Sequence, residues 1–301
     1  MSRTVVVGVD ESSESLAAAE WAAEEAKARD LPLRLVHAWN WSPHPASDVP
    51  LGATSAGAAQ HARARAALDR AETRVRGACP AVPLTADALE GPASTALLRA
   101  AEQAEVLVLG SRGLGAISGV VVGSVAQSVA AAAPVPVVLV RAGTPTAHPH
   151  GPAPEDKPRA DVVLGLDLSD PCDEVVDFAF AEAALKGARL HVVSTWRSPS
   201  LYTLGPGELA LAARPQRQEE WHGFQDAVLQ TWRGKFPGVE VTATVVEGRA
   251  VTPILAATEG ACLVVVGRRA PGRHRSGHHN GPVTHAVMHH ARCPVAIVPH
   301  S

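Results

Sequence analysis

The chain of 301 residues has the length of two domains of about 150 residues each. Apolar residues make up 46% and charged residues 19%, a composition that excludes a disordered chain. The net charge of −3, with histidines counted as neutral, gives no overall attraction to nucleic acid or to an anionic membrane, so neither is expected as a partner. The first apolar run is too short for a signal peptide and the four cysteines are far apart, so we expect a cytoplasmic protein with reduced thiols.

The first half of the chain alternates between strand and helix patterns. Residues 4–9 form a continuous apolar run, as expected of a parallel strand buried on both faces. Ser12 or Ser13 is suited to cap the helix that follows. The solvent face of that helix is predicted to carry Glu20, Glu24, Glu25 and Lys27. Further strands are expected at 33–39, 84–89, 105–109 and 136–140, and further helices at 54–76, 94–104 and 123–132.

This alternation predicts an α/β fold, in which an open parallel sheet is covered by helices on both faces through right-handed crossovers. The uncharged stretch at 113–140 is long enough to span a bilayer, but its glycines, serines and two prolines divide it into a loop, a helix and a strand. We therefore expect no membrane-spanning segment.

The second half of the chain repeats the first. Five segments recur in the same order, four of them at an offset of 157 residues and the closing strand at 158. The matched segments are 5–10 with 162–167, Trp39 with Trp196, 90–91 with 247–248, 106–110 with 263–267, and 136–140 with 294–298. The repeat predicts two domains of one fold, at 1–142 and 161–301, joined by a Pro-rich linker at 143–160.

The loops after the first and fourth strands are the expected site, because ligands of such sheets bind where the strand order reverses. The loop at 110–124 is rich in glycine and opens a helix at Gly123 and Ser124, where free N–H groups favour an anion. Arg112 adds positive charge, which completes a phosphate cradle. A P-loop is excluded because the cradle has no lysine, and the first loop, 10–13, lacks the glycines of a dinucleotide fingerprint.

Gly110, Gly113, Gly123 and Ser124 follow the spacing Gly-x2-Gly-x9-Gly-Ser. Together with the opening strand that ends in Asp10 and the closing Pro-Val strand, this spacing resembles the universal stress protein family in its tandem form. The resemblance covers the chain apart from the linker. It implies two Rossmann-like domains of the adenine nucleotide alpha hydrolase type, each with a five-stranded parallel sheet, that bind ATP with or without Mg²⁺.

The resemblance also implies which residues of the first domain hold ATP. Those near the adenine are Asp10 and the backbone of Val9 and Ala38; those near the ribose and phosphates are Gly110, Arg112, Gly113, Gly123, Ser124 and Val125. For Asp10 the residues by themselves leave a second interpretation, a helix N-cap, and we favour the ligand role because Asp10 ends a strand beside the glycine loop.

The second domain departs from the pattern. It keeps Asp167 and Gly267, but Ala270 replaces the second glycine and Pro282, which has no N–H, stands where the serine is expected. Its loop is instead dense in arginine and histidine. Two interpretations stay open: this copy has lost ATP and serves structure or regulation, or it still binds an anion through its arginines and histidines.

Histidines cluster in and after this loop, at His274, His278, His279, His285, His289 and His290. No carboxylate or cysteine accompanies them in the pattern of a zinc site, so no metal site is predicted.

The predicted function is an ATP-binding regulatory protein of the stress response, without catalytic residues. Hydrolysis would need a base and carboxylates for Mg²⁺, and the first cradle offers only the distant Asp10. The alternative is an enzyme of the same fold that performs slow ATP hydrolysis or adenylyl or phosphoryl transfer. By the resemblance, strands 137–140 and 295–298 pair within the chain. A homodimer, and a protein partner for which ATP is the switch, are left open.

Overall fold

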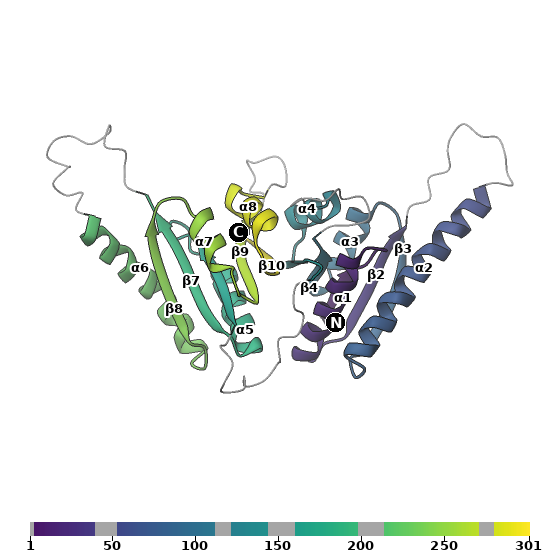
Figure 1. Ribbon diagram of the computed structural model, residues 1–301, viewed down its shortest axis with the longest axis horizontal. Helices are drawn as coiled ribbons and strands as arrows, with labels where there is room; N and C mark the ends of the chain where they lie inside the picture. The colour runs from purple at the N-terminus through teal and green to yellow at the C-terminus, as the bar shows by residue number, and fades with distance from the viewer. Residues whose placement is uncertain (1–2, 40–52, 112–121, 144–159, 198–213, 271–279) are drawn as a thin grey trace. The chain divides into compact units, whose positions relative to one another are not determined.

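The computed structural model describes residues 3–39, 53–111, 122–143, 160–197, 214–270 and 280–301. Two compact units contain these residues, unit 1 built on 1–147 and unit 2 on 148–269 and 281–301 (Figure 1). Each unit carries five parallel strands with helices on both faces, which confirms the predicted tandem α/β fold. The linker predicted at 143–160 lies almost wholly outside the described residues.

Unit 1 has the strand order β3-β2-β1-β4-β5, all parallel. Helices α1 and α2 pack on one face of the sheet, and α3 and α4 pack on the other. The elements are β1 (Thr4–Gly8), α1 (Ser13–Ala28), β2 (Leu33–Trp39), α2 (Ala53–Ala78), β3 (Leu84–Glu90), α3 (Ala93–Ala101), β4 (Ala104–Gly110), α4 (Ser124–Ala132) and β5 (Val137–Val140).

Unit 2 repeats this plan with the order β10-β9-β6-β7-β8. Helices α5 and α6 cover one face, and α7 and α8 cover the other. The elements are β6 (Asp161–Leu166), α5 (Asp173–Lys186), β7 (Arg189–Trp196), α6 (Arg214–Lys235), β8 (Val241–Glu247), α7 (Val251–Ala257), β9 (Leu263–Arg269), α8 (Pro282–His290) and β10 (Val295–His300).

The core of each unit follows from the apolar strands and the small residues of the first helix. Val5, Val6 and Val7 of β1 are completely buried, as a strand in the middle of a two-faced sheet requires. Ala18 and Ala22 of α1 are also completely buried, and their short side chains let the helix lie close to the strands.

A turn after the third strand of each unit shows the repeat at the level of single hydrogen bonds. The N–H of Gly91 donates to the carbonyl of Trp39 at 2.8 Å, and that of Gly248 donates to Trp196 at 2.9 Å. Both glycines have positive φ, +124° and +137°, which favours glycine over any other residue. The Glu-Gly and Trp matches of the sequence thus mark a turn of the same geometry in both halves of the chain.

The first helix of each unit contains a buried ion pair at equivalent positions. Glu25 pairs with Arg29 at 2.7 Å in α1, and Glu182 pairs with Lys186 at 3.0 Å in α5. The prediction that Glu25 faces solvent is wrong, since its side chain is only 1% exposed. The helix packs against both the sheet and α2, so its buried face is wider than the alanine pattern alone indicates.

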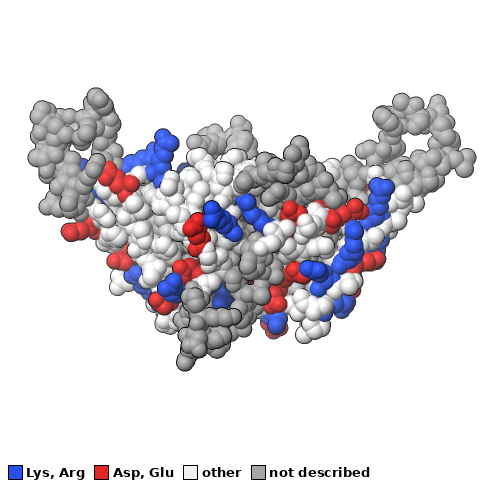
Figure 2. Space-filling view, viewed as in Figure 1, with Lys and Arg blue, Asp and Glu red and all other residues white. Residues whose placement is uncertain are grey.

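Several arginines of helix α2 form ion pairs with acidic side chains. Arg74 pairs with Glu20 of α1, and Arg76 pairs with Glu72 at 2.8 Å. Figure 2 shows blue and red side chains intermingled over the described surface in this view. Because these pairs are exposed, each contributes about 0–1 kcal/mol to stability.

All four cysteines lie among the described residues as thiols, and Cys79, Cys262 and Cys293 are buried, which agrees with the prediction of packed, unbridged cysteines. Among the described residues, no helix has the length and apolar character needed to cross a bilayer.

Burial raises the pKa of the Cys262 thiol to about 11. Above the ordinary thiol pKa of about 8.5 the unfolded chain loses this proton, whereas the folded chain keeps it until about pH 11. The folded state then binds more protons, so the free energy of unfolding is expected to fall by about 3 kcal/mol as pH rises across this window.

Urea unfolding at a series of pH values, in the presence of a reductant, measures this fall. The variant Cys262→Ala is the control, because it lacks the thiol and is expected to show a shallower decline. Parallel curves for the two proteins would contradict the assignment of the effect to Cys262.

Candidate functional site

The strand order of unit 1 reverses at β1, which lies between β2 and β4. The register places Gly8 beside both Val36 and Leu109. Asp10 and Ser111 follow the ends of β1 and β4, and His37 lies near the end of β2, so all three residues are at one carboxyl edge of the sheet. This edge is the site that doubly wound sheets use for ligands.

Asp10 shapes the turn between β1 and α1. Its Oδ1 accepts from the backbone N–H of Ser12 at 2.9 Å and also from the Ser12 hydroxyl. Ser12 is the N-cap of α1, since its Oγ accepts from the N–H of Ser15 at 3.1 Å. The cap is thus the serine and not Asp10, whose half-buried carboxylate is fixed at the edge of the sheet.

Two buried polar atoms at this edge have no hydrogen-bond partner within the described part of the chain. They are Nδ1 of His37, at the end of β2, and Oγ of Ser111, directly after β4. A buried polar group without a partner costs about 1–3 kcal/mol, so such atoms mark a place for a ligand or an ordered water. Burial lowers the pKa of His37 and outweighs the carbonyl of Val9 and the charge of Asp10, which both act to raise it. The imidazole is therefore neutral at pH 7.

Helix α4 begins at the same edge. Its N-cap, Gly123, donates its N–H to the carbonyl of Ser111 at 2.9 Å, which ties the helix to the end of β4. The first intrahelical bond runs from Gln127 to the carbonyl of Gly123. Helix geometry leaves the N–H groups of Ser124 and Val125 without acceptors inside the helix, and both residues are exposed. A helix N-terminus of this kind favours an anion.

Gly110 is required by the packing of the turn itself. A Cβ at this position would lie 2.9 Å from the backbone carbon of Glu14 and 2.9 Å from the backbone nitrogen of Ser15. The end of β4 therefore approaches the first turn of α1 more closely than a side chain permits. The sequence pointed to a ligand as the reason for this glycine, and the structure adds helix packing as a second reason.

Unit 2 keeps the first turn of this site and changes the rest. Oδ1 of Asp167 accepts from the N–H of Ser169 at 2.9 Å and from its hydroxyl at 2.6 Å, as Asp10 does with Ser12. Arg268, 4% exposed, takes the place of Ser111, and burial lowers the pKa of its guanidinium. Pro282 begins α8 at the position of Ser124, so one backbone donor is missing.

The remaining predicted residues are Val9 and Ala38, which the structure places at the ends of β1 and β2, and Arg112 and Gly113, which lie outside the described residues. His274, His278 and His279 of the second loop lie outside them too. His285 and His289 share a face of α8, with ring centroids 4.4 Å apart.

The side chains of His37 and Ser111 were not among the site residues predicted from the sequence. Ser111 follows the first glycine of the cradle and His37 lies near the end of an apolar strand, so both positions carried a signal. Burial without a partner, which singles them out, is a property of the assembled sheet.

The structure defines a class of protein with two tandem α/β units, in which the sheet edge of the first unit favours an anion. The model of the universal stress protein family matches residues 1–141 and 159–299, and the chain belongs to this family. A universal stress protein of Mycobacterium tuberculosis is 31% identical, over 97% of this chain and 96% of that protein.

A solved structure that covers the whole chain shows the same fold. A universal stress protein from Archaeoglobus fulgidus has a TM-score of 0.67 and 18% identity, with both chains covered completely. Another universal stress protein, solved in complex with cAMP, is 29% identical over 47% of this chain and 98% of that chain, with a TM-score of 0.36.

Proposed function

We propose that unit 1 binds an adenine nucleotide, ATP, at the carboxyl edge of its sheet, and that binding serves regulation in the stress response rather than catalysis. The observation that carries this proposal is the pair of buried, unpartnered atoms, His37 Nδ1 and Ser111 Oγ, on the strands that flank β1. Membership of the universal stress protein family supports it.

The residues present fit such a ligand. Asp10 and the backbone of Val9 and Ala38 are proposed to contact the adenine side, where the neutral His37 offers either a donor or an acceptor. The phosphates are proposed to lie at the start of α4. Because the N–H of Gly123 already donates to Ser111, the donors left for a phosphate are those of Ser124 and Val125.

A regulatory role fits the chemistry of this edge better than turnover. Asp10, the acid that ends β1, is held by Ser12 as part of the cap of α1. General-base catalysis needs a group free to take a proton from water. ATP bound here supplies charge and shape that a partner can recognise, with or without Mg²⁺.

Unit 1 is proposed as the main nucleotide-binding unit. In unit 2 a buried arginine, Arg268, stands where unit 1 has the hydroxyl of Ser111, and Pro282 removes the N–H that Ser124 supplies. Because unit 2 keeps Asp167 and Gly267, its adenine-binding side is proposed to bind nucleotide more weakly than unit 1.

The variant Ser124→Pro tests the phosphate site, because it copies unit 2 into unit 1. Proline is favoured at the first position of a helix, so α4 is expected to form while losing one N–H and one hydroxyl. Each hydrogen bond to a charged group contributes about 1.5–3 kcal/mol, so ATP affinity is expected to fall by about 10-fold or more. Isothermal titration calorimetry on the full chain measures this affinity.

Ser128→Ala is the matched control, since Ser128 is an exposed serine one turn further along α4 and is expected to leave affinity unchanged. Absence of ATP binding to the unmodified chain, or equal affinity in Ser124→Pro, would refute the site. Multiple-turnover phosphate release that Asp10→Asn abolishes would support an enzyme instead.

A further inference from the structure

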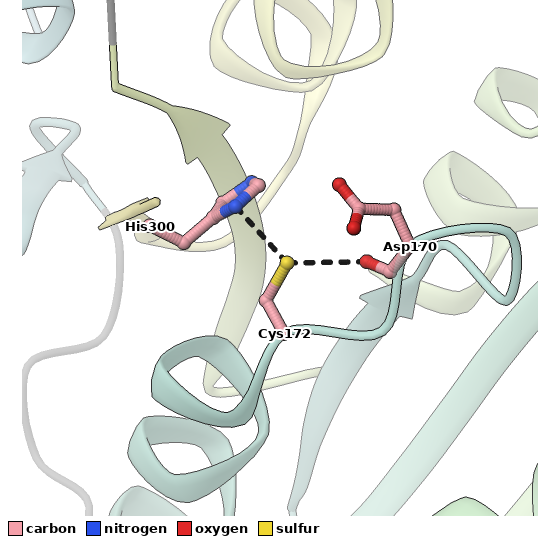
Figure 3. Close-up of side chains that lie close together, drawn as sticks. All are labelled: Asp170, Cys172 and His300. Atoms are coloured by element: carbon pink, nitrogen blue, oxygen red, sulfur yellow. Dashed lines mark hydrogen bonds between the residues drawn. The ribbon is translucent and has the colours of Figure 1, made fainter. Parts of the chain in front are cut away.

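Three metal-ligating side chains meet at the carboxyl edge of the unit 2 sheet. Asp170 and Cys172 lie in the loop between β6 and α5, and His300 ends β10 (Figure 3). One ligand atom from each, a carboxylate oxygen, the sulfur and an imidazole nitrogen, lies within 4.8 Å of the other two. The sulfur of Cys172 is 3.0 Å from Nδ1 of His300 and 3.1 Å from the backbone oxygen of Asp170.

We propose that Asp170, Cys172 and His300 bind one zinc ion. Thiolate, imidazole and carboxylate are the three ligand types that zinc takes in proteins, whereas magnesium and calcium prefer oxygen alone. Three protein ligands leave a fourth position for water or for an anionic ligand. The inference concerns unit 2 and does not depend on nucleotide binding by unit 1.

The backbone holds the sulfur in place. Cys172 is the N-cap residue of α5, yet in the described part of the chain its side chain makes no capping hydrogen bond. The sulfur is directed at His300 and at the carbonyl of Asp170 instead (Figure 3). The helix starts three residues later than the duplicated pattern requires, since α1 begins at Ser13 and α5 at Asp173. The longer loop brings Cys172 to the edge of the sheet.

The histidine is held by strand pairing and by a glycine. His300 pairs with Arg269 in the register of β10 and β9. A Cβ on Gly267 would lie 3.0 Å from Cδ2 and 3.1 Å from Nε2 of His300, so the imidazole lies directly over this glycine. Gly267 packs against the Cδ2 and Nε2 side of the imidazole, and Nδ1 faces the sulfur. The two ligand atoms are thus positioned before a metal ion binds.

The charges around the site favour a dication. The carboxylates of Asp170 and Glu174 lie near the Cys172 sulfur, and their negative charges attract a zinc ion. A zinc ion bound by the sulfur takes the place of the thiol proton.

Arg269 is the cation that now pairs with Asp170. The side chains are 58% and 43% exposed, so this pair contributes about 1 kcal/mol or less and the carboxylate can exchange it for a metal.

Unit 1 has no equivalent ligand set. The positions that correspond by the repeat offsets to Asp170, Cys172 and His300 are Ser13, Ser15 and Ala142. The proposed metal site is thus specific to the unit whose glycine cradle has changed.

Cobalt titration of the chelator-treated, reduced full chain tests the proposal. Co²⁺ substitutes for zinc and gives a thiolate-to-cobalt charge-transfer band in the near ultraviolet, which sites made only of histidine do not give. We expect a band that saturates at one ion per chain and that zinc displaces. Cys172→Ser is expected to remove the band, and His300→Gln to weaken cobalt binding by at least about 10-fold.

Cys79→Ser and His191→Gln are the matched controls, because they remove a thiol and an imidazole elsewhere in the described chain and are expected to leave the band unchanged. Serine is a good N-cap residue, so Cys172→Ser is expected to fold, which far-ultraviolet circular dichroism checks. If Cys172→Ser does not fold, the variant His300→Gln, at the end of β10, tests the metal site in its place. Absence of the band, or a band that survives both substitutions, overturns the proposal.

Discussion

Replacing Lys186 with methionine is expected to lower the free energy of unfolding by about 3–5 kcal/mol. The Nζ of Lys186 lies 3.0 Å from Oε2 of Glu182, and the two side chains are 4% and 0% exposed. Methionine has a similar shape, so the change removes a charge with little loss of packing. The carboxylate of Glu182 then stays in the core without the ammonium that faces it, and urea unfolding measures the cost.

The matched variant in unit 1 is Arg29→Met. It breaks the equivalent pair with Glu25, but Arg29 is 16% exposed and water reaches this pair more easily. A smaller loss is therefore expected. The double variant Glu182→Leu with Lys186→Met is expected to recover most of the stability, because removing both charges also removes their desolvation cost. Equal losses for Lys186→Met and Arg29→Met, or a loss below about 1 kcal/mol for Lys186→Met, would contradict the assignment of the effect to the buried pair.

Gly110→Ala is expected to destabilise unit 1 by about 1–3 kcal/mol and to weaken ATP binding at the same time. The added Cβ would meet backbone atoms of Glu14 and Ser15 at 2.9 Å, and backbone cannot rotate away as a side chain can. The first turn of α1 must shift, and that turn is fixed to Asp10 through Ser12. Urea unfolding and calorimetry on the same variant measure the two effects.

Gly77→Ala supplies the contrast. Gly77 lies in α2, and a Cβ added there would meet nothing within 4 Å beyond the backbone of its own helix. Alanine at this position is therefore expected to stabilise by up to about 1 kcal/mol through helix propensity. If Gly110→Ala behaved like Gly77→Ala, the close approach of β4 to α1 would not govern stability.

Local patterns in the sequence were enough to predict the strands, the order of the elements and the duplication. Strand β2 runs over Leu33–Trp39, the limits that its apolar pattern predicts, and the Glu-Gly turns recur with their hydrogen bonds to Trp39 and Trp196. These features depend on residues close in sequence, whose periodicity and turn chemistry act locally. The glycine cradle was visible for the same reason, although Arg112 and Gly113 remain predictions.

Which side chains meet depends instead on the assembled sheet. Glu25 is buried because a helix and a sheet enclose α1 together, which the helix period alone does not show. His37 and Ser111 come to one edge through the pairing of β1 with its two neighbours. Cys172 and His300 lie 128 residues apart, with no spacing that signals a metal site. Contacts of this kind arise from strand order and register, which set distances between residues that the sequence keeps far apart.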